Sequence, residues 1–431
     1  MPASRSRRSL VVGFALFALA LSACGSSSTT TAKPAAGQSS PPASGTAPVA
    51  TIAPAPPTGP VPPAVNAGLV SWPGALHDAA HSGTSAVVGP QGATIRWTHK
   101  LEGPISAGPA VAVDGTIYES SNAGILHALD PMTGADKWTF NGGGSADDGQ
   151  DLSTTAAILS DGTILWPGPR STLFALDPSG RMLWSQALQG TVLSPAVGAT
   201  GKVYVADSKG DVVALAPTPT TVSKLWTISI GKESFGSPAL AADGTIYGTA
   251  DKDLVAITDA GDHATVAWRF HAGDIIEVSP SVAPDGTVVL GTNDPYEYGI
   301  TAKGAVAWKY PRKAFSYSTP AATVDGLAYF GDNDGYVDVV NSATGKPLGR
   351  YDGTAKAISS VGVGVWTAPL VDARHDVYFG TAAGHIFGFA YGGARLFDFN
   401  AGATVDSYPA LTPDGTLVIG ADNGMLYGFH A

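Results

Sequence analysis

A unit of about 43 residues recurs through most of the chain, and this repeat constrains the fold more than any other feature. Each unit joins a short apolar run to a turn of the Asp-Gly-Thr type, followed by an apolar and an aromatic residue, as in Ala110–Tyr118 and Ala239–Tyr247. Regular self-similarity on this scale is typical of propellers and solenoids. The second turn residue recurs every 39 to 49 residues, at Gly115, Gly162, Gly201, Gly244, Gly286, Gly326, His375 and Gly415.

Aromatic residues form a second marker that recurs with the same period as the turns. Large aromatic residues recur at intervals of 40 to 46 residues, at Trp97, Trp138, Trp184, Trp226, Trp268, Trp308, Tyr351 and Phe397. Eight turns and eight aromatic residues indicate eight units.

Each unit has the pattern of four short strands. Alternating runs such as Ala110–Val113 and Thr116–Tyr118 meet at an Asp-Gly pair, which suits a tight hairpin turn with positive φ. A second turn precedes a third strand at Ile125–Leu129, and a fourth strand carries the tryptophan. Four-stranded units at this period are propeller blades, so the sequence predicts an all-β, eight-bladed propeller.

The two ends of the repeat region predict how the ring closes. The last unit, Val405–His430, has three inner strands and no outer one, whereas Thr94–Leu101 is an outer strand with no unit before it. Pairing the two completes the eighth blade and leaves no open sheet edge.

The N-terminal region has the pattern of an export and anchoring signal. Arg5, Arg7 and Arg8 precede an apolar stretch at Leu10–Ala23, which is shorter than the ~20 residues of a spanning helix. The following Cys24 completes a sequence that resembles the bacterial lipobox. We therefore expect a signal peptide at 1–23, a lipidated Cys24 with a disordered Ser/Thr/Ala/Pro-rich linker to residue 70, and a propeller over 71–431. The arginine pair leaves Sec and twin-arginine export both open.

Charge and cysteine content exclude several classes of function. The formal net charge is −11, which argues against a nucleic-acid surface because such surfaces need clustered Lys and Arg. Cys24 is the only cysteine, so the chain can form no internal disulfide and no thiolate cluster.

The segment Ala128–Trp138 carries the pattern A-x-D-x-x-T-G-x-x-x-W through Ala128, Asp130, Thr133 and Gly134. It resembles the docking motif of pyrroloquinoline quinone (PQQ)-like propeller repeats, and Trp72-Pro73 to His81-Ser82-Gly83 resembles the lead-in of bacterial members. The resemblance implies that each Trp indole stacks between blades on a neighbouring glycine. Gly349 stands where this motif would place Trp. Quinoprotein members bind PQQ with a Ca²⁺ held by Glu, Asn and Asp oxygens, but no motif of this chain places that cofactor.

The loops that enter the innermost strands supply a candidate binding site at one mouth of the central channel. The third residue before the proline position of each repeat is aromatic or acidic in several blades, which suits recognition of a protein or a sugar. These positions are Ser106, Leu152, Val192, Phe235, Glu277, Tyr317, Trp366 and Asp406. Packing against neighbouring blades is the alternative interpretation.

Two polar groups are interpreted as structural. Asp332–Gly335 resembles a calcium loop only superficially, because the full spacing and its distant Glu are missing, so we expect a hairpin turn. His271, Asp274 and Glu277 lie close together in sequence, and we expect a solvated loop there. The sequence predicts no metal site, no catalytic residue and no resident cofactor.

These observations favour a non-enzymatic, lipid-anchored scaffold on the extracytoplasmic face of a bacterial membrane, or in the periplasm or on the outer membrane of a two-membrane cell. We expect a monomeric propeller that binds an envelope protein, similar in architecture to the propeller lipoproteins of the outer-membrane β-barrel assembly machinery. A quinoprotein oxidising an alcohol or sugar, and a carbohydrate-binding module or sensor, are the alternatives.

Overall fold

The structure is a computed structural model that describes residues 57, 71–144, 154–313, 315–354 and 363–430. The predicted signal peptide, Cys24 and nearly all of the predicted linker lie outside these residues, as does Leu152. The described residues form thirty-two strands and no helix. None of them forms a helix long and apolar enough to cross a membrane.

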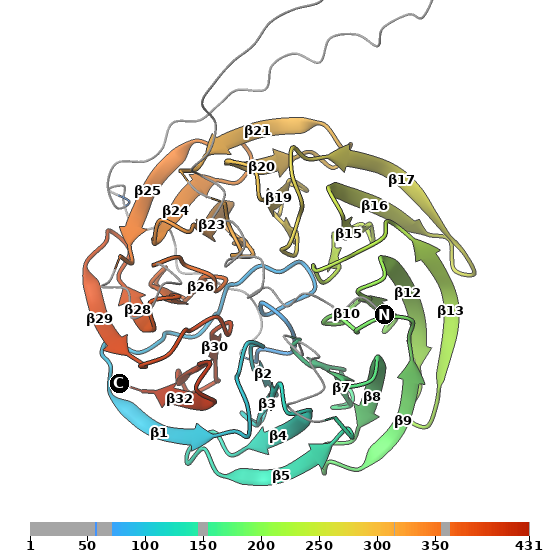
Figure 1. Ribbon diagram of the computed structural model, residues 1–431, viewed down its shortest axis with the longest axis horizontal. Coiled ribbons are helices and arrows are strands. Elements are labelled where there is room, and N and C mark those ends of the chain that lie inside the picture. Colours follow the sequence, from blue (N-terminus) through green and yellow to red (C-terminus); the bar gives the residue numbers. More distant parts are fainter. Residues whose placement is uncertain (1–56, 58–70, 145–153, 314, 355–362, 431) are drawn as a thin grey trace, which may run out of the picture. The chain divides into compact units, whose positions relative to one another are not determined.

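The strands form eight four-stranded antiparallel sheets, which are arranged as the blades of one ring (Figure 1). The first four blades, from the innermost strand outward, are β2(Ala110–Val111) to β5(Asp136–Asn141) through β3(Ile117–Ser121) and β4(Ile125–Leu129); β6(Ala157–Ile158), β7(Ile164–Gly168), β8(Thr172–Leu176) and β9(Met182–Ala187); β10(Ala196–Val197), β11(Val203–Ala206), β12(Asp211–Pro217) and β13(Val222–Ser229); and β14(Ala239–Leu240), β15(Ile246–Ala250), β16(Asp253–Asp259) and β17(Ala264–His271).

The other four blades repeat this order. They are β18(Ser281–Val282), β19(Val288–Gly291), β20(Tyr296–Ile300) and β21(Val306–Pro311); β22(Ala321–Ala322), β23(Leu327–Gly331), β24(Tyr336–Asn341) and β25(Pro347–Asp352); β26(Leu370–Val371), β27(Val377–Gly380), β28(His385–Phe389) and β29(Arg395–Asn400); and β30(Ala410–Leu411), β31(Leu417–Gly420), β32(Met425–Phe429) and β1(Ile95–Lys100). We number them blades 1 to 8 in this order. The predicted fold class is confirmed.

The first hairpin of every blade turns at the predicted residue. All eight of these residues have positive φ, from 65° at His375 to 86° at Gly244. In blade 1 the Asp114 carboxylate accepts hydrogen bonds from the backbone N–H and the hydroxyl of Thr116, both at 2.9 Å. Glycine suits such turns because it adopts positive φ without steric cost. His375 occupies the position in blade 7, where its Nε2 lies 2.8 Å from Asp325 Oδ2 of blade 6.

The chain closes the ring as the sequence predicts. Strand β1 pairs antiparallel with β32, with Trp97 opposite Gly428 and Lys100 opposite Met425. A Cβ atom added to Gly428 would lie 2.4 Å from Trp97 Cε2, so the indole packs directly on the glycine backbone. The closing strand therefore depends on a residue without a side chain at this position.

Tryptophans dock consecutive blades against each other. Trp97 Nε1 of blade 8 donates a 2.9 Å hydrogen bond to Pro131 O of blade 1, and its ring covers Gly134. Asp130 Oδ1 orders this turn by accepting hydrogen bonds from the backbone N–H groups of Met132 and Thr133. The same donation to a neighbouring blade recurs at Trp138, Trp184, Trp226, Trp268 and Trp308. In blade 6, where the Trp position is Gly349, the fully buried Tyr351 lies 5.6 Å from Phe389 of blade 7, measured between ring centroids.

Residues 71–89 cross the middle of the ring (Figure 1). We call Ser71–Gly89 the channel segment. Its backbone bonds to the innermost strands of five blades, through pairs that include Trp72 with Val111, Ala79 with Leu240, and Ala80 with Val282. The remaining two of these five blades are bonded through Pro73 with Ile158 and through Gly83 with Val371. Inner strand edges that would otherwise be unpaired are thus satisfied by the chain's own N-terminal residues.

Each inner strand has one end at a loop from the preceding blade and the other at an Asp-Gly type turn. We call the two faces of the ring the loop face and the turn face. In each inner strand that it reaches, the channel segment bonds to the second of the two residues, and it reaches Ala373 in the blade 7 turn through Val87. It therefore crosses the channel near the turn face, which leaves the loop face as the side where predicted mouth residues lie.

Candidate functional site

The loop face carries the candidate mouth residues on consecutive blades. Phe235, Glu277, Tyr317, Trp366 and Asp406 precede the innermost strands of blades 4, 5, 6, 7 and 8. Val192, the corresponding residue of blade 3, is buried in a core cluster with Leu165 and Val205. The packing interpretation therefore holds for Val192.

Tyr317 and Trp366 come together with Phe315 in one aromatic group. The Tyr317 and Trp366 rings lie 5.8 Å apart at an interplanar angle of 87°, and those of Phe315 and Tyr317 lie 5.2 Å apart at 76°. Edge-to-face pairs of this kind are a favoured aromatic geometry. Tyr317 is buried and Trp366 half-buried, whereas Phe315 is 40% exposed. We call these three residues the aromatic group. Phe315 was absent from the sequence prediction, although its i, i+2 spacing to Tyr317 is a signal that could have found it.

The turn at Asp332–Gly335 holds Trp366 in place. It joins β23 to β24 as a hairpin turn, in which Asp332 Oδ1 accepts the backbone N–H groups of Asp334 and Tyr336 at 3.0 and 3.1 Å. Asn333 Oδ1 in turn accepts a short hydrogen bond from Trp366 Nε1. Burial raises the pKa of Asp332, as expected for a carboxyl used inside the fold. The calcium-loop alternative finds no support, because this aspartate binds its own turn.

The acidic mouth residue Glu277 is bonded to a neighbouring amide. Glu277 is 6% exposed, and its Oε2 accepts a 2.7 Å hydrogen bond from Asn293 Nδ2. Ca²⁺ requires six to eight oxygen ligands. Here the Asn293 amide faces the carboxylate with its nitrogen, so this amide offers the carboxylate's neighbourhood no oxygen ligand. The residues at this mouth therefore do not fit the PQQ and Ca²⁺ pair of quinoproteins.

The structure does not bring His271, Asp274 and Glu277 to a common point. His271 Nδ1 lies 2.7 Å from Asp253 Oδ1, and Asp274 Oδ1 lies 3.1 Å from Lys252 Nζ. Glu277 turns instead to Asn293. The three side chains have separate partners, in accord with a polar loop.

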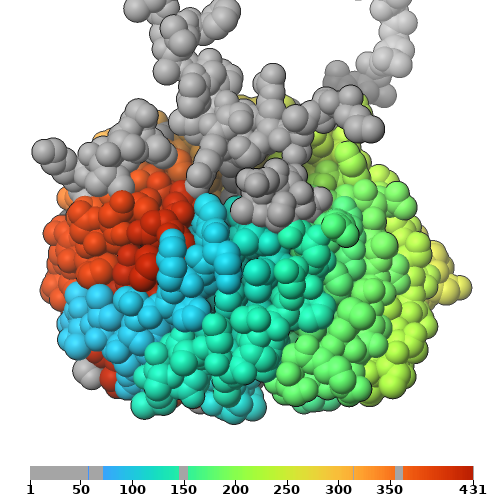
Figure 2. Space-filling view, turned by 60° about the horizontal axis from the view of Figure 1, so that its bottom comes forward, coloured from blue at the N-terminus to red at the C-terminus, as the bar shows by residue number. Residues whose placement is uncertain are grey.

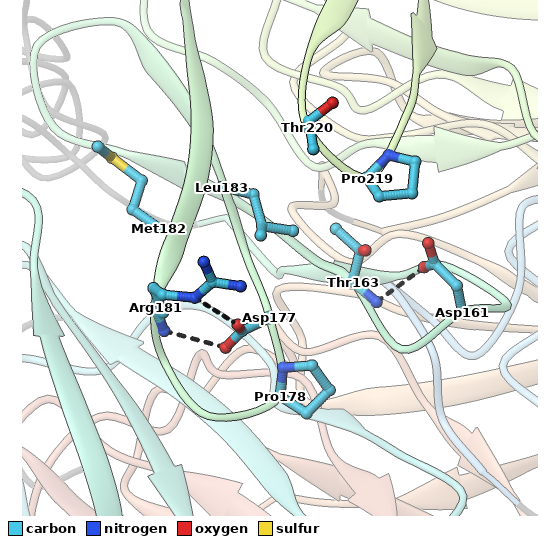
Figure 3. A pocket seen from close by; sticks show the side chains of 9 residues that line it. All are labelled: Asp161, Thr163, Asp177, Pro178, Arg181, Met182, Leu183, Pro219 and Thr220. Carbon is cyan, nitrogen blue, oxygen red and sulfur yellow. Dashed lines mark hydrogen bonds and ion pairs between the residues drawn. The ribbon is translucent and has the colours of Figure 1, made fainter.

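A pocket of 390 Å³ opens at the turns of blades 2 and 3 (Figure 3). Its two carboxylates are hydrogen-bonded within their own turns. Asp177 accepts hydrogen bonds from Ser179 and Arg181, and Asp161 accepts the backbone N–H of Thr163 at 3.0 Å. The remaining lining residues are mainly apolar, so the pocket presents little chemistry for a specific ligand.

Eight four-stranded blades, docked by tryptophans and closed by an N-terminal strand, define a PQQ-like repeat propeller. The PQQ_2 family profile, described as "Outer membrane protein assembly factor BamB", matches residues 122–222 and 209–431. The chain belongs to this family.

Two curated relatives match shorter stretches. The outer membrane protein assembly factor BamB of Burkholderia pseudomallei (strain K96243) is 32% identical over 118 residues, which are 27% of this chain and 28% of that protein. The serine/threonine-protein kinase AfsK of Streptomyces griseus is 33% identical over 147 residues, which are 33% of this chain and 18% of the kinase. The chain thus spans less than a third of the length of either relative.

Solved structures share the fold at low sequence identity. BamB from Moraxella catarrhalis superposes with a TM-score of 0.55 at 15% identity, covering 78% of this chain and 99% of that one. Quinohemoprotein alcohol dehydrogenase from Comamonas testosteroni gives 0.60 at 15% identity over 83% and 80% of the two chains. Saccharomyces cerevisiae Sqt1 gives 0.66 at 11% identity over 79% and 99%. An enzyme and an assembly factor therefore share this architecture, so the fold alone does not decide the activity.

Proposed function

We propose that this protein is a non-enzymatic scaffold of the bacterial cell envelope, held at the membrane by a lipid on Cys24, that binds an envelope protein through its loop face. The observation that carries the proposal is the aromatic group. Aromatic side chains supply large, rigid contact area at low entropic cost and are enriched at the energetic centres of protein interfaces. Phe315 leaves part of this area open to a partner.

Family membership supports the same role. The family description refers to assembly of outer membrane proteins, and we carry over from it only an envelope location and a protein partner.

The quinoprotein alternative receives less support from the residues of the mouth. Glu277 Oε2 accepts a hydrogen bond from the Asn293 amide, which turns its nitrogen toward the carboxylate. The chain also lacks the vicinal cysteine pair of alcohol-oxidising quinoproteins, since Cys24 is its only cysteine.

Site-specific photo-crosslinking in intact cells tests the proposal. A photoreactive phenylalanine analogue replaces Phe315, and the matched control places it at Val113, a 79% exposed residue in the blade 1 turn on the turn face. We expect a discrete adduct with one envelope protein from position 315 and none from position 113. Trp366→Ala should reduce the yield of this adduct. The same adducts from both positions, or no adduct from position 315, would refute binding through the loop face.

A further inference from the structure

Two histidines and an aspartate meet at the seam where the ring closes. His99 lies on the closing strand β1 of blade 8, whereas His127 and Asp136 lie on β4 and β5 of blade 1. One ligand atom from each residue lies within 4.8 Å of the other two. Figure 2 shows this side of the molecule, where the blue N-terminal strand lies between the red C-terminal blade and the teal first blade. The group therefore joins two blades that are adjacent only because the ring closes.

The two carboxylate oxygens of Asp136 face different histidines. His127 Nδ1 lies 2.8 Å from Asp136 Oδ1, and His99 Nε2 lies 3.6 Å from Asp136 Oδ2. The two imidazole centroids are 5.7 Å apart. Ligands of a tetrahedral ion about 2 Å from each donor lie roughly 3.3 Å from one another, so small side-chain rotations would bring these atoms into a coordination sphere.

A second carboxylate orients the buried histidine from its other side. His127 Nε2 lies 3.0 Å from Glu102 Oε2, and His127 itself is only 2% exposed. Histidines that bind metals usually donate their second ring N–H to a carboxylate or carbonyl, which fixes the tautomer and strengthens the ligand nitrogen. Glu102 would keep the proton on Nε2 and leave Nδ1 free to face Asp136 and His99.

We propose that His99, His127 and Asp136 bind a divalent transition metal ion of the Zn²⁺ type, with Glu102 as the residue that positions His127. Imidazole nitrogens combined with one carboxylate suit Zn²⁺ and its neighbours in the transition series, whereas Ca²⁺ and Mg²⁺ require oxygen ligands. Asp136 is 38% exposed, so the site opens to solvent and a water molecule can complete the tetrahedron.

The proposed ion would link blade 8 to blade 1. Strand β1 is held by its pairing with β32 and by the docking of Trp97 on blade 1. A metal bound by His99 on one blade and by two residues of the next adds a further link at the seam between blade 8 and blade 1. Binding to the folded state alone would raise the stability of the closed ring.

Without an ion, His127 is hydrogen-bonded to Asp136 and Glu102, and histidine–carboxylate pairs of this kind occur elsewhere in the molecule. His271 and Asp253 form one such pair at 2.7 Å on the outer strands of blade 4. Among the residues that the structure describes, no second histidine joins this pair in a group of three potential metal ligands. His271→Ala is therefore a matched control, since it removes a histidine–aspartate pair without touching the seam.

The test uses the full chain in detergent, purified without a polyhistidine tag and stripped of metal. Zn²⁺ uptake is measured by calorimetry and elemental analysis, and Co²⁺ replaces Zn²⁺ for absorption spectroscopy. We expect one ion per chain, intense visible Co²⁺ bands typical of tetrahedral coordination, and a higher unfolding temperature with Zn²⁺. His99→Ala and Asp136→Asn should abolish all three effects, and His271→Ala should leave them intact.

Glu102→Gln distinguishes the positioning role from ligation. We expect this variant to retain one ion per chain and the tetrahedral Co²⁺ bands while its affinity falls about 10- to 100-fold. His99 and Glu102 are partly exposed, so these variants should fold even if changes at the buried His127 do not. No stoichiometric uptake by the wild type, or uptake unchanged in His99→Ala, would overturn the proposal.

Discussion

A buried carboxyl in blade 5 should make the propeller less stable as the pH rises from 5 to 8. Glu297 on β20 is fully buried, and neither of its carboxylate oxygens has a hydrogen bond within the described structure. Arg312 Nε approaches Glu297 Oε2 only to 3.6 Å, beyond hydrogen-bond range. Arg312 Nη2 is instead bonded to the carbonyls of Thr292 and Tyr296 at 2.6 and 2.9 Å. Burial therefore raises the pKa of Glu297 to about 8 despite the nearby guanidinium.

The magnitude follows from the linkage between proton binding and folding. The pKa of this group rises from 4.5 to about 8 on folding, so the folded state binds the proton more tightly. Its contribution to stability is complete below pH 4.5 and is lost as the pH rises toward 8, at up to about 1.4 kcal/mol per pH unit. The loss between pH 5 and 8 is roughly 4 kcal/mol at most.

Glu297→Gln removes this proton equilibrium while keeping the shape of the side chain. The buried amide should cost about 1–2 kcal/mol at every pH, since it too lacks partners. At pH 5 the variant should therefore be slightly less stable than the wild type, and at pH 8 it should be the more stable protein. Asp372, whose pKa burial raises to about 6, contributes equally to both proteins and cancels in the comparison. Asp338, whose pKa burial also raises to about 6, repels the Glu297 carboxylate and therefore adds to the difference as the pH rises.

Urea unfolding of both proteins at pH 5, 6, 7 and 8 measures the effect. Glu233→Gln on an exposed loop is the control and should follow the wild type at every pH. A difference between Glu297→Gln and wild type that does not change from pH 5 to pH 8 would show that the carboxyl does not titrate in this window, and the reasoning would fail.

Three further predictions concern closure, the channel and the anchor. Gly428→Ala should destabilise the ring by about 1–3 kcal/mol, because the added Cβ would lie 2.4 Å from Trp97 Cε2. Gly92→Ala is the control, since a Cβ at Gly92 has no atom within 4 Å, and equal unfolding temperatures of the two variants would contradict the prediction. Asp78 accepts the backbone N–H groups of Ala80 and Ser82 at 3.0 and 3.1 Å, so Asp78→Ala should cost about 1–3 kcal/mol and speed amide exchange in the channel segment, and unchanged exchange would count against it. Cys24→Ser should release the chain from the membrane fraction and stop incorporation of a clickable fatty acid, and continued labelling would rule out this anchor.

The contribution of Asp78 to the stability of the fold should also depend on pH. Burial alone would raise its pKa, but hydrogen bonds from His77 and Ser82 and the proximity of His77 hold it at about 2. Because the folded pKa lies below the ordinary aspartate value of 3.8, this group stabilises the fold above that pH and loses its effect as the pH falls toward 2. Asp78→Ala should therefore remove stability at neutral pH and little at pH 2, which acid unfolding curves would reveal.

The architecture of the ring could be predicted from residue spacing because its determinants are local. A hairpin needs positive φ at one position, and a residue such as Gly115 or Gly415 supplies it wherever the chain lies in space. The missing outer strand of the last unit and the extra strand at Thr94–Leu101 predicted the pairing of β1 with β32. The match of Ala128–Trp138 to a known repeat motif identified the docking surfaces for the same reason.

The candidate sites depended on contacts between blades, which spacing does not encode. Tyr317 and Trp366 were predicted at the mouth, but their contact and the support from Asn333 follow from how blades 6 and 7 are set beside each other. His99 and His127 are separated by 28 positions and meet only because the closing strand is placed against blade 1.

The sequence by itself determined the number of blades, their turns and the way the ring closes, since each depends on a residue type at a regular position along the chain. The tertiary structure alone decided that Ser71–Gly89 fills the channel and that Glu297 lies beside Arg312 without a hydrogen bond. Such outcomes depend on the distance and orientation of side chains from different elements, which are fixed only when the blades pack.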